Sequence, residues 1–452
     1  MTRVTAPESW RTLRAVTGDL IALGIDQGTS GARAVVMTGA GEVLGTGRVA
    51  CRDLRRTDHA SEHDPSAWLD ESFGAAREAI AHAGCARVDA IGVGALGPAP
   101  VLLDADLRPI APAPLFPMEP MSAWIEGLPD ETIASAVWLV DVAGFIVSTL
   151  VGRPVMDRIT AADHDGSIEL PEPGEPFDVA GNLTASAAER LGIRAGAPAT
   201  TGTYDTFVDL AAVGAAEAGS AAILLGSTVI VGAVSDGVST PEGLRASRHA
   251  GPGWFVGGWT STAGRALEWA ASLGAEAEGT RARAGAMIPG AGGVLALPYL
   301  DGERAPVWDP NARGALVGFT TSTTVADIYR AMLDGVVLST VDLARRLAPI
   351  RGQAPWVVAG GGVRDDGWLR ATVDALGEPV TAIDLPDAGA AARAAFTAIG
   401  APLSAPAGRS VEPDPEVHER WAELAAIHRD LYPALADPMH RLAALTVHGG
   451  AA

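Results

Sequence analysis

The feature that most constrains this chain is an apolar strand that ends in an acidic residue and a turn of small polar residues. Residues 21–25 are mostly apolar, Asp26 follows them, and Gly28-Thr29-Ser30 precede a second apolar run at 34–37. Such a turn presents backbone N–H groups and hydroxyls to an anion, and a carboxylate at the strand end can hold a hydrated divalent cation against that anion. The stretch is therefore either half of a nucleotide phosphate site or an ordinary hairpin.

The same arrangement returns in the second half of the chain. An apolar run at 221–225, the turn Gly226-Ser227-Thr228 and a second apolar run at 229–234 repeat the order of strand, small polar turn and strand. An internal duplication of this kind predicts two phosphate-facing hairpins across a cleft between two similar domains. The length of 452 residues is also too great for one core.

We expect an N-terminal domain at 1–198, a C-terminal domain at 199–430 and a C-terminal tail at 431–452. The periodicity predicts helices at 66–83 and 136–151 in the first domain. In the second domain, helices and strands alternate, which predicts an α/β fold with elements at 325–347, 356–359, 366–376, 380–383 and 389–399.

Charge and composition exclude several classes of protein. The net charge of −21 argues against binding to nucleic acid or to an anionic membrane surface. All 33 basic residues are Arg, so a P-loop of the form G-x-x-x-x-G-K-[ST], a Schiff-base enzyme and a protein kinase are excluded, because each needs a lysine. Any phosphate chemistry must use backbone amides, Arg and metal.

The cysteines and the apolar runs indicate a cytoplasmic protein. Cys51 and Cys85 have no metal-like spacing, so we interpret them as reduced thiols. The longest apolar run, near 142–151, is interrupted by Gly and Ser and is too short to span a bilayer.

One segment matches the H-x-x-E-H pattern of zinc peptidases, from His59 to His63. That pattern needs both histidines on one face of a helix. Asp64 followed by Pro65 is instead an N-cap with proline at the first helical position, so the helix begins after the motif. A zinc peptidase is therefore not expected.

Six motifs in order give the chain a family resemblance. The sequence resembles the FGGY carbohydrate kinases of the actin and hexokinase-like ATPase superfamily, and especially the xylulokinase branch. The matching segments are Asp26-Gln27-Gly28-Thr29-Ser30-Gly31-Ala32-Arg33, Glu62-His63-Asp64-Pro65, Gly202-Thr203-Tyr204-Asp205, Gly226-Ser227-Thr228, Pro298-Tyr299-Leu300-Asp301-Gly302-Glu303-Arg304-Ala305-Pro306 and Gly360-Gly361-Gly362.

This resemblance implies an α/β fold with two ribonuclease H-like domains flanking a nucleotide cleft that binds ATP and Mg²⁺. Asp26 would hold Mg²⁺, directly or through water. The β- and γ-phosphates would lie against two turns, where small residues let backbone amides approach. The residues implied in nucleotide binding are Gly28, Thr29, Ser30 and Arg33 in the first motif, Gly226, Ser227 and Thr228 in the second, Gly264 near the terminal phosphates, and Gly360, Gly361 and Gly362 at the adenosine.

Three of the matching motifs also have a purely structural interpretation. Asp205 matches the catalytic base, which would orient the attacking hydroxyl and accept its proton; its alternative role is a helix N-cap. Gly360-Gly361-Gly362 could instead form an ordinary turn between strand and helix. Glu303 and Arg304 fit the cleft and an internal ion pair equally well, and we do not assign them a catalytic role.

The sugar-reading positions depart from the family. Leu96-Gly97-Pro98-Ala99 stands where xylulokinases carry Gln-Met-His-Gly, and Phe116-Pro117-Met118-Glu119 stands where they carry Trp-x-Asp-x-Arg. A site that hydrogen-bonds a given hydroxyl rejects molecules lacking it, so these changes affect substrate choice more than ATP binding.

Two hypotheses follow. The first is an ATP-dependent kinase that phosphorylates a hydroxyl of a pentulose, xylulose-like, or of a related sugar or polyol. The second is a catalytically idle, nucleotide-binding regulator or sugar sensor of the same fold. The expected partner is a small-molecule sugar or polyol, with no nucleic acid and no membrane, and a homodimer is left open.

Overall fold

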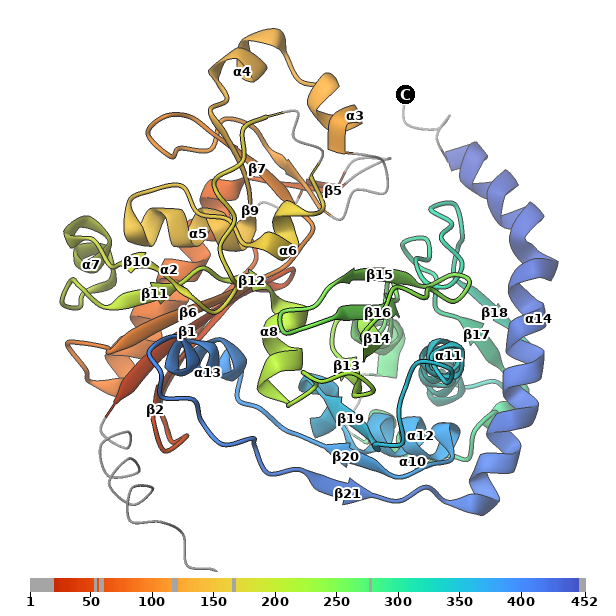
Figure 1. The fold of residues 1–452 in the computed structure, drawn as a ribbon. Helices are drawn as coiled ribbons and strands as arrows, with labels where there is room; N and C mark the ends of the chain where they lie inside the picture. The colour runs from red at the N-terminus through yellow and green to blue at the C-terminus, as the bar shows by residue number, and fades with distance from the viewer. Residues whose placement is uncertain are drawn as a thin grey trace, which may run out of the picture. The chain divides into compact units, whose positions relative to one another are not determined.

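The computed structural model describes residues 20–52, 55–56, 61–115, 121–164, 168–275 and 279–446. These form two compact units (Figure 1), the first from the described residues of Met1–Ala212 with Leu385–Ala405, and the second from Val213–Asp384 with those of Pro406–Ala452. Among the helices of the described residues, none combines the length and the apolar character needed to cross a bilayer.

The first unit is organised around one mixed sheet. Its order is β10-β11-β6-β1-β2-β3, and β12 also pairs with β6. β1 is antiparallel to β2 and parallel to β6, so Asp26 lies opposite both Arg33 and Gly94. The strands are β1 (Ile21–Gly28), β2 (Gly31–Thr38), β3 (Val43–Ala50), β6 (Ala90–Ala95), β10 (Val179–Asn182), β11 (Pro198–Thr200) and β12 (Thr203–Tyr204).

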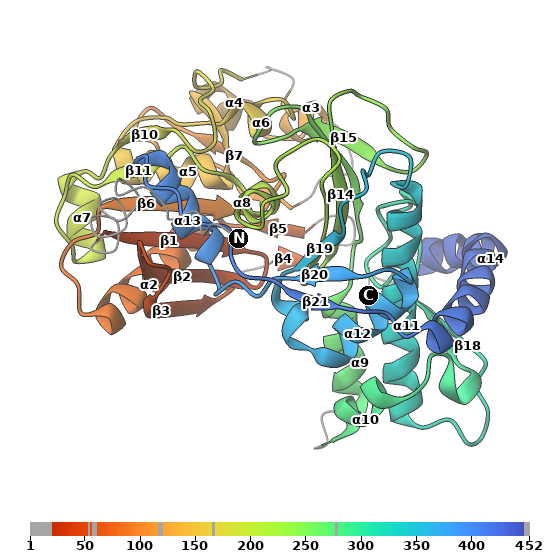
Figure 2. The ribbon, with the colours of Figure 1, turned by 60° about the horizontal axis from the view of Figure 1, so that its bottom comes forward.

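Helices cover both faces of this sheet, which explains why residues 21–25 of β1 are apolar. Leu23 and Ile25 pack in the cluster that contains residues of α2 (Pro65–Ala83), whereas Ala22 packs with Phe396 of α13 (Gly389–Ala398). Figures 1 and 2 both show α13, blue in the chain colouring, lying along β1 and β6. Alternate side chains of a strand point to opposite faces, so one strand serves both layers.

The unit boundaries differ from the predicted division after residue 198. β11 and β12 pair with β6, which keeps the chain as far as Ala212 in the first unit. The segment Leu385–Ala405 also belongs to the first unit, because Gly24 and Gly92 let the backbone of α13 approach the sheet closely. The predicted tail is not separate either, since α14 (Pro415–Thr446) runs across residue 431 and its Met439 packs with Leu297 and Tyr299 of the second unit.

The predicted helix at 136–151 is a strand followed by a helix. β9 (Trp138–Asp141) pairs with β7 (Pro100–Leu103), and Asp141 then caps α5 (Val142–Val151) by accepting a hydrogen bond from the Val142 N–H. The remaining elements of this unit are β4 (Arg55–Arg56), β5 (Ser61–His63), β8 (Ala113–Pro114), α3 (Met121–Glu126), α4 (Asp130–Ser135), α6 (Arg158–Ala161), α7 (Ala185–Leu191) and α8 (Asp205–Ala212).

The second unit has its own sheet, in the order β15-β16-β14-β13-β19-β20-β21. The predicted hairpin forms, because β13 pairs antiparallel with β14, and β13 pairs parallel with β19. The strands are β13 (Ala221–Leu225), β14 (Val229–Ser235), β15 (Arg245–Arg248), β16 (Trp254–Trp259), β19 (Trp356–Ala359), β20 (Val380–Ala382) and β21 (Arg409–Val411), and β17 (Leu295–Leu297) pairs separately with β18 (Ala315–Val317).

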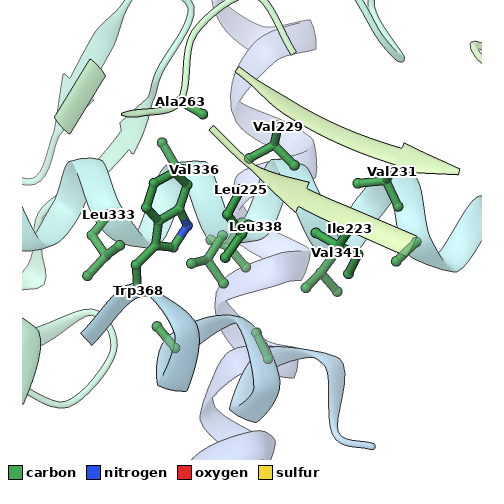
Figure 3. Close-up of a cluster of buried hydrophobic side chains, with 14 of the residues drawn as sticks. Ile223, Leu225, Val229, Val231, Ala263, Leu333, Val336, Leu338, Val341 and Trp368 are labelled. Carbon is green, nitrogen blue, oxygen red and sulfur yellow. The ribbon is translucent and has the colours of Figure 1, made fainter. Parts of the chain in front are cut away.

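Its core lies between this sheet and the helices α11 (Val325–Arg346) and α12 (Asp366–Leu376). Figure 3 shows Leu225 from β13 and Val336 from α11 beside the indole of Trp368. The other helical segments are α9 (Gly264–Ala270), a π-helical turn at Ala271–Ala275, α10 (Thr280–Ala286) and 3₁₀ turns at Ala291–Gly293 and Gly361–Arg364.

Candidate active site

The turn of the first hairpin is braced by Arg33. Arg33 Nη1 lies 3.3 Å from Asp26 Oδ2, and its Nη2 donates a hydrogen bond to Ser30 Oγ at 2.9 Å. Its Nε also lies 3.9 Å from Asp387 Oδ2. The pairing follows from register, since Asp26 and Arg33 are cross-strand partners in β1 and β2. One guanidinium therefore serves two carboxylates and the hydroxyl of the turn.

The sheet brings Asp205 to the same edge as Asp26. Thr203 of β12 pairs with Gly94 of β6, and Gly94 in turn pairs with Asp26 of β1. Asp205 follows β12 directly and is the first residue of α8. Its Oδ1 accepts a hydrogen bond from the Thr206 N–H at 2.6 Å, so the carboxylate also supports the start of the helix.

Burial and mutual repulsion raise the pKa values of these carboxyl groups. Burial, followed by the charge of Asp26, raises the pKa of Asp205 to about 7. Asp209, one turn further along α8, has its pKa raised well above the usual range by burial and by the charges of Asp26 and Asp205. Burial also raises the pKa of Asp26, although Arg33 opposes the shift.

This concentration of carboxylates fits a divalent cation. Asp26, Asp205, Asp209 and Asp387 interact electrostatically, and Arg33 is the cation that opposes them in the pKa shifts of the first three. Mg²⁺ is a hard ion that prefers carboxylate and water oxygens. A cation held by Asp26 would relieve the repulsion that raises these pKa values, so the residues present fit the ion that the sequence predicts.

The second hairpin turn is held by the start of α9. The N–H of Gly264 donates to the Gly226 carbonyl at 3.1 Å, and the Gly226 N–H donates to the Thr228 carbonyl at 3.0 Å. A Cβ at Gly264 would lie 2.7 Å from the Gly226 oxygen, so only glycine allows this approach. Gly226, Ser227 and Thr228 are partly exposed, which leaves the turn accessible to an anion.

The three consecutive glycines after β19 do not share one role. Gly360 has φ 93°, and a Cβ there would lie 2.5 Å from the Leu225 oxygen. Gly362 packs just as closely against Leu225 and the ring of Trp368. Gly361, in contrast, is exposed, with open space where a Cβ would stand. Close packing therefore requires glycine at positions 360 and 362. Gly361 instead offers exposed backbone on which a purine could lie.

Glu303 and Arg304 form internal contacts in the second unit. Glu303 Oε1 accepts hydrogen bonds from the Ser261 N–H at 2.7 Å and from the Arg304 N–H at 2.8 Å. Arg304 Nη2 donates to the Thr260 carbonyl at 2.7 Å. Both side chains are buried and fix the chain after β16, which accounts for them without a catalytic role.

Comparison with known families identifies this arrangement. The model described as "FGGY family of carbohydrate kinases, N-terminal domain" matches residues 21–140, and the corresponding C-terminal domain model matches residues 219–399. Together they cover more than half of the chain. It belongs to the FGGY family of carbohydrate kinases.

The relatives of this FGGY family member differ in substrate. The chain is 27% identical over 437 residues to a xylulose kinase from Klebsiella pneumoniae, covering 83% of this chain and 90% of that protein. It is 28% identical over 272 residues to a gluconokinase from Bacillus subtilis, covering 51% of this chain and 52% of that protein. The xylulose kinase structure from Rhodospirillum rubrum superimposes with a TM-score of 0.75 at 24% identity, covering 93% of this chain and all of that one. The predicted fold, two α/β domains of the actin and hexokinase-like type, is confirmed.

A polar cluster lies beside the altered run at 96–99, and the sequence did not predict it. The Tyr204 hydroxyl lies 3.1 Å from Asp141 Oδ2 and 2.9 Å from Asp163 Oδ2. His164 Nε2 lies 3.8 Å from Asp141 Oδ2, with both side chains buried. A Cβ at Gly97 would lie 1.9 Å from the Tyr204 ring, so the glycine that stands in the altered run makes room for this tyrosine. The segment 116–119 lies outside the described residues.

Asp209 and Asp387 were also missed. Asp209 lies four residues after Asp205, a spacing that places both on one face of a helix, so the helical pattern could have indicated it. Asp387 reaches the cluster only because α13 packs on β1, and no local sequence signal predicts that contact.

Proposed function

We propose that this FGGY kinase transfers the γ-phosphate of ATP to a hydroxyl of a pentulose, xylulose-like, or of a related neutral sugar or polyol. The observation that carries the proposal is Asp205, a carboxyl with a pKa raised to about 7 at the same sheet edge as Asp26. A general base works best when its pKa lies near the operating pH. A carboxyl that only starts a helix needs no such value.

Asp205 would act on the acceptor rather than on the nucleotide. Phosphoryl transfer demands little covalent work from the protein, so catalysis depends on positioning and charge. The Asp205 carboxylate would accept a hydrogen bond from the acceptor hydroxyl, orient it in line with the phosphorus and take its proton as the bond forms. The Thr206 N–H, at 2.6 Å, fixes one carboxylate oxygen and leaves the other for the substrate.

The nucleotide and Mg²⁺ would use the two hairpin turns. Asp26 would hold Mg²⁺, which neutralises phosphate charge when bound, and Arg33 with the Gly28–Ser30 turn would contact phosphate oxygens. In the second unit, the Gly226–Thr228 turn would bind phosphate and the exposed backbone at Gly361 would carry the adenine. Because the chain lacks lysine, all these contacts rely on backbone amides and arginine.

The polar cluster at Tyr204 favours a neutral acceptor over a sugar acid. Its members are a phenol, the carboxylates of Asp141 and Asp163, and the imidazole of His164. Carboxylates accept hydrogen bonds from sugar hydroxyls but repel a second carboxylate. Since Tyr204 directly precedes Asp205 in the chain and its hydroxyl donates to Asp141 and Asp163, a gluconate-like acceptor would meet unfavourable charge near the proposed base.

The second candidate is a catalytically idle nucleotide-binding protein of the same fold. The observation that favours it is the Tyr204 ring, which packs against Gly97 in the run where xylulokinases carry Gln-Met-His-Gly. An idle protein needs no base with a pKa of about 7, so Asp205 favours the kinase.

Acceptor-dependent release of ADP separates the two candidates. The chain would be assayed with MgATP and a panel of pentuloses, hexuloses, tetritols, glycerol and gluconate, with Asp205→Asn as the matched variant. We expect at least one neutral acceptor to raise ADP release in the wild type and not in the variant. MgATP binding without any acceptor-dependent turnover would favour the idle protein, and gluconate as the best acceptor would contradict the neutral class.

A further inference from the structure

Three potential metal ligands from three elements of the first unit converge away from the catalytic carboxylates. Cys51 follows β3, His63 ends β5 and Glu71 lies on α2. Cys51 Sγ lies 3.2 Å from His63 Nε2, and His63 Nε2 lies 4.0 Å from Glu71 Oε1. The three donor atoms all lie within 4.8 Å of one another.

Hydrogen bonding fixes the tautomer of His63. Its Nδ1 lies 2.9 Å from the Asp64 carbonyl oxygen. A carbonyl can only accept, so Nδ1 carries a proton, and in the neutral ring it is Nε2 that presents its lone pair to Cys51. The ring also stacks on Trp68, with centroids 4.8 Å apart and planes inclined by 13°. A second nitrogen held by a backbone carbonyl is the usual arrangement of a metal-binding histidine.

Glu71 supplies a buried negative charge that is also oriented. Its side chain is 1% exposed. Oε1 accepts a hydrogen bond from the Arg52 N–H at 2.6 Å, and Oε2 accepts one from Gln27 Nε2 at 3.0 Å. Its Oε1 lies 4.0 Å from His63 Nε2, and Arg52 also interacts with it electrostatically. Buried carboxylates are normally paired with a cation or bound to a metal.

The donor set and its spacing fit one class of ion. Tetrahedral Zn²⁺ with its usual bond lengths to sulfur, nitrogen and oxygen places these donors roughly 3.3 to 3.6 Å apart. The separations of 3.2 Å and 4.0 Å bracket that range, so small side-chain rotations would complete the site. Thiolate and imidazole select borderline-soft cations and not Mg²⁺, which prefers oxygen ligands.

We propose that Cys51 Sγ, His63 Nε2 and Glu71 Oε1 bind one borderline-soft divalent cation, with Zn²⁺ the best fit, and that water fills the fourth position. On binding, the Cys51 thiol loses its proton to solvent and the thiolate donates an electron pair to the cation. The oxidation states do not change. The H-x-x-E-H pattern does not provide this site, because Asp64 caps α2 and Pro65 begins it, so His63 lies before the helix.

The site is linked to the first hairpin turn. Glu71 accepts from Gln27, the residue after Asp26, and the Cys51 N–H donates to the Ser30 carbonyl at 3.0 Å. A cation that fixes Cys51 and Glu71 would therefore restrict the motion of the first hairpin turn through these two hydrogen bonds. An effect on ATP affinity rests on the proposed function, whereas binding of the cation does not.

The test titrates the full chain, reduced and freed of metal with a chelator, with Co²⁺ alone and then with Zn²⁺ alone. Excess Mg²⁺ is present so that the all-oxygen site is occupied. We expect one equivalent of Co²⁺ to bind with a thiolate-to-cobalt charge-transfer band in the near ultraviolet, and Zn²⁺ to displace it. This measurement on the wild type needs no variant to fold.

Variants then assign the ligands. We expect Cys51→Ser to remove the charge-transfer band, and Cys51→Ser and Glu71→Gln each to weaken Zn²⁺ binding by at least about tenfold, since even outer-shell changes cost that much. Cys85→Ser is the matched control, because it removes the other half-buried thiol of the chain and should change nothing. A cobalt spectrum without the thiolate band would overturn the proposal in favour of a metal-free thiol–imidazole pair. A band that survives Cys51→Ser or is lost in Cys85→Ser would overturn it by assigning the thiolate ligand to Cys85.

Discussion

Replacing Asp205 with asparagine should abolish phosphoryl transfer without disturbing the fold. The asparagine oxygen can still accept the Thr206 N–H, so the first turn of α8 keeps its hydrogen bond. The lost function is proton acceptance. A general base contributes about 10²- to 10⁴-fold, which corresponds to roughly 2.7 to 5.4 kcal/mol in activation free energy.

The pH profile of the wild type follows from the raised pKa of Asp205. The active form is the carboxylate, and burial with the charge of Asp26 raises the pKa to about 7. About a tenth of the groups are then ionised at pH 6 and about nine-tenths at pH 8. We expect kcat/KM to rise roughly tenfold between these values and to level off above them.

Stability gives an independent readout of the same variant. Because the folded pKa of Asp205 lies above its unfolded value, the folded state favours the protonated form, and that stabilisation is lost as the pH rises through about 7. At pH 8 the wild type carries a disfavoured charge that Asp205→Asn lacks. The variant should therefore melt at an equal or higher temperature at pH 8, and the difference should narrow as the pH falls below 7.

Coupled ADP-release assays from pH 5.5 to 9, together with thermal melts, check both effects. Asp70→Asn is the control, because Asp70 is an exposed carboxylate on α2 of the same unit. An Asp205→Asn variant within about threefold of wild-type turnover, or a wild-type acid limb near pH 4, would refute the reasoning. Asp205 would then serve only to begin α8.

Three further outcomes are expected. Asp26→Asn should lower Mg²⁺-dependent turnover by roughly 10²-fold, since charge stabilisation by a bound divalent ion is worth several kcal/mol. The same variant should move the acid limb of the pH profile to lower pH, because the charge of Asp26 raises the pKa of Asp205. Gly92→Ala should destabilise the protein in urea by about 1 to 3 kcal/mol, because its Cβ would lie 1.9 Å from the Ala391 oxygen, whereas Gly237→Ala, with open space, should not. D-xylulose should have a kcat/KM roughly 10- to 10³-fold below that of the best acceptor, since the altered run removes about two or three hydrogen bonds and each unreplaced one costs about 0.5 to 1.5 kcal/mol. Efficient D-xylulose turnover would show that other groups rebuild the site.

Local signals predicted the elements that carry the site. The apolar run before Asp26 and the turn after it form β1 and its hairpin, and Asp64 with Pro65 begins α2. The second hairpin and α11 also lie where the pattern places them. In each case the signal lies within one segment, namely a strand run, a turn residue or a cap. Such features depend on neighbouring residues and not on tertiary contacts.

Contacts between distant segments could not be predicted in this way. The return of α13 to the first sheet depends on Gly24 and Gly92, whose missing side chains admit its backbone. The run before α5 extends the apolar pattern of the helix, and a short apolar segment fits a helix or a buried strand equally well. It forms β9 because β7 offers it a partner, and this strand delivers Asp141 to the polar cluster.

The two hairpins carry different side chains at the strand positions before their turns. In the first, the cross-strand pair before the turn is Asp26 with Arg33, which provides a carboxylate for a cation and a guanidinium for an anion. In the second, the strand positions before Gly226 are Leu224 and Leu225, and Leu225 packs in the core of that unit. The second hairpin can therefore offer only backbone and hydroxyl groups. Under the proposed function, a divalent cation would therefore bind at the first hairpin, and the proposed base, Asp205, lies at the same sheet edge.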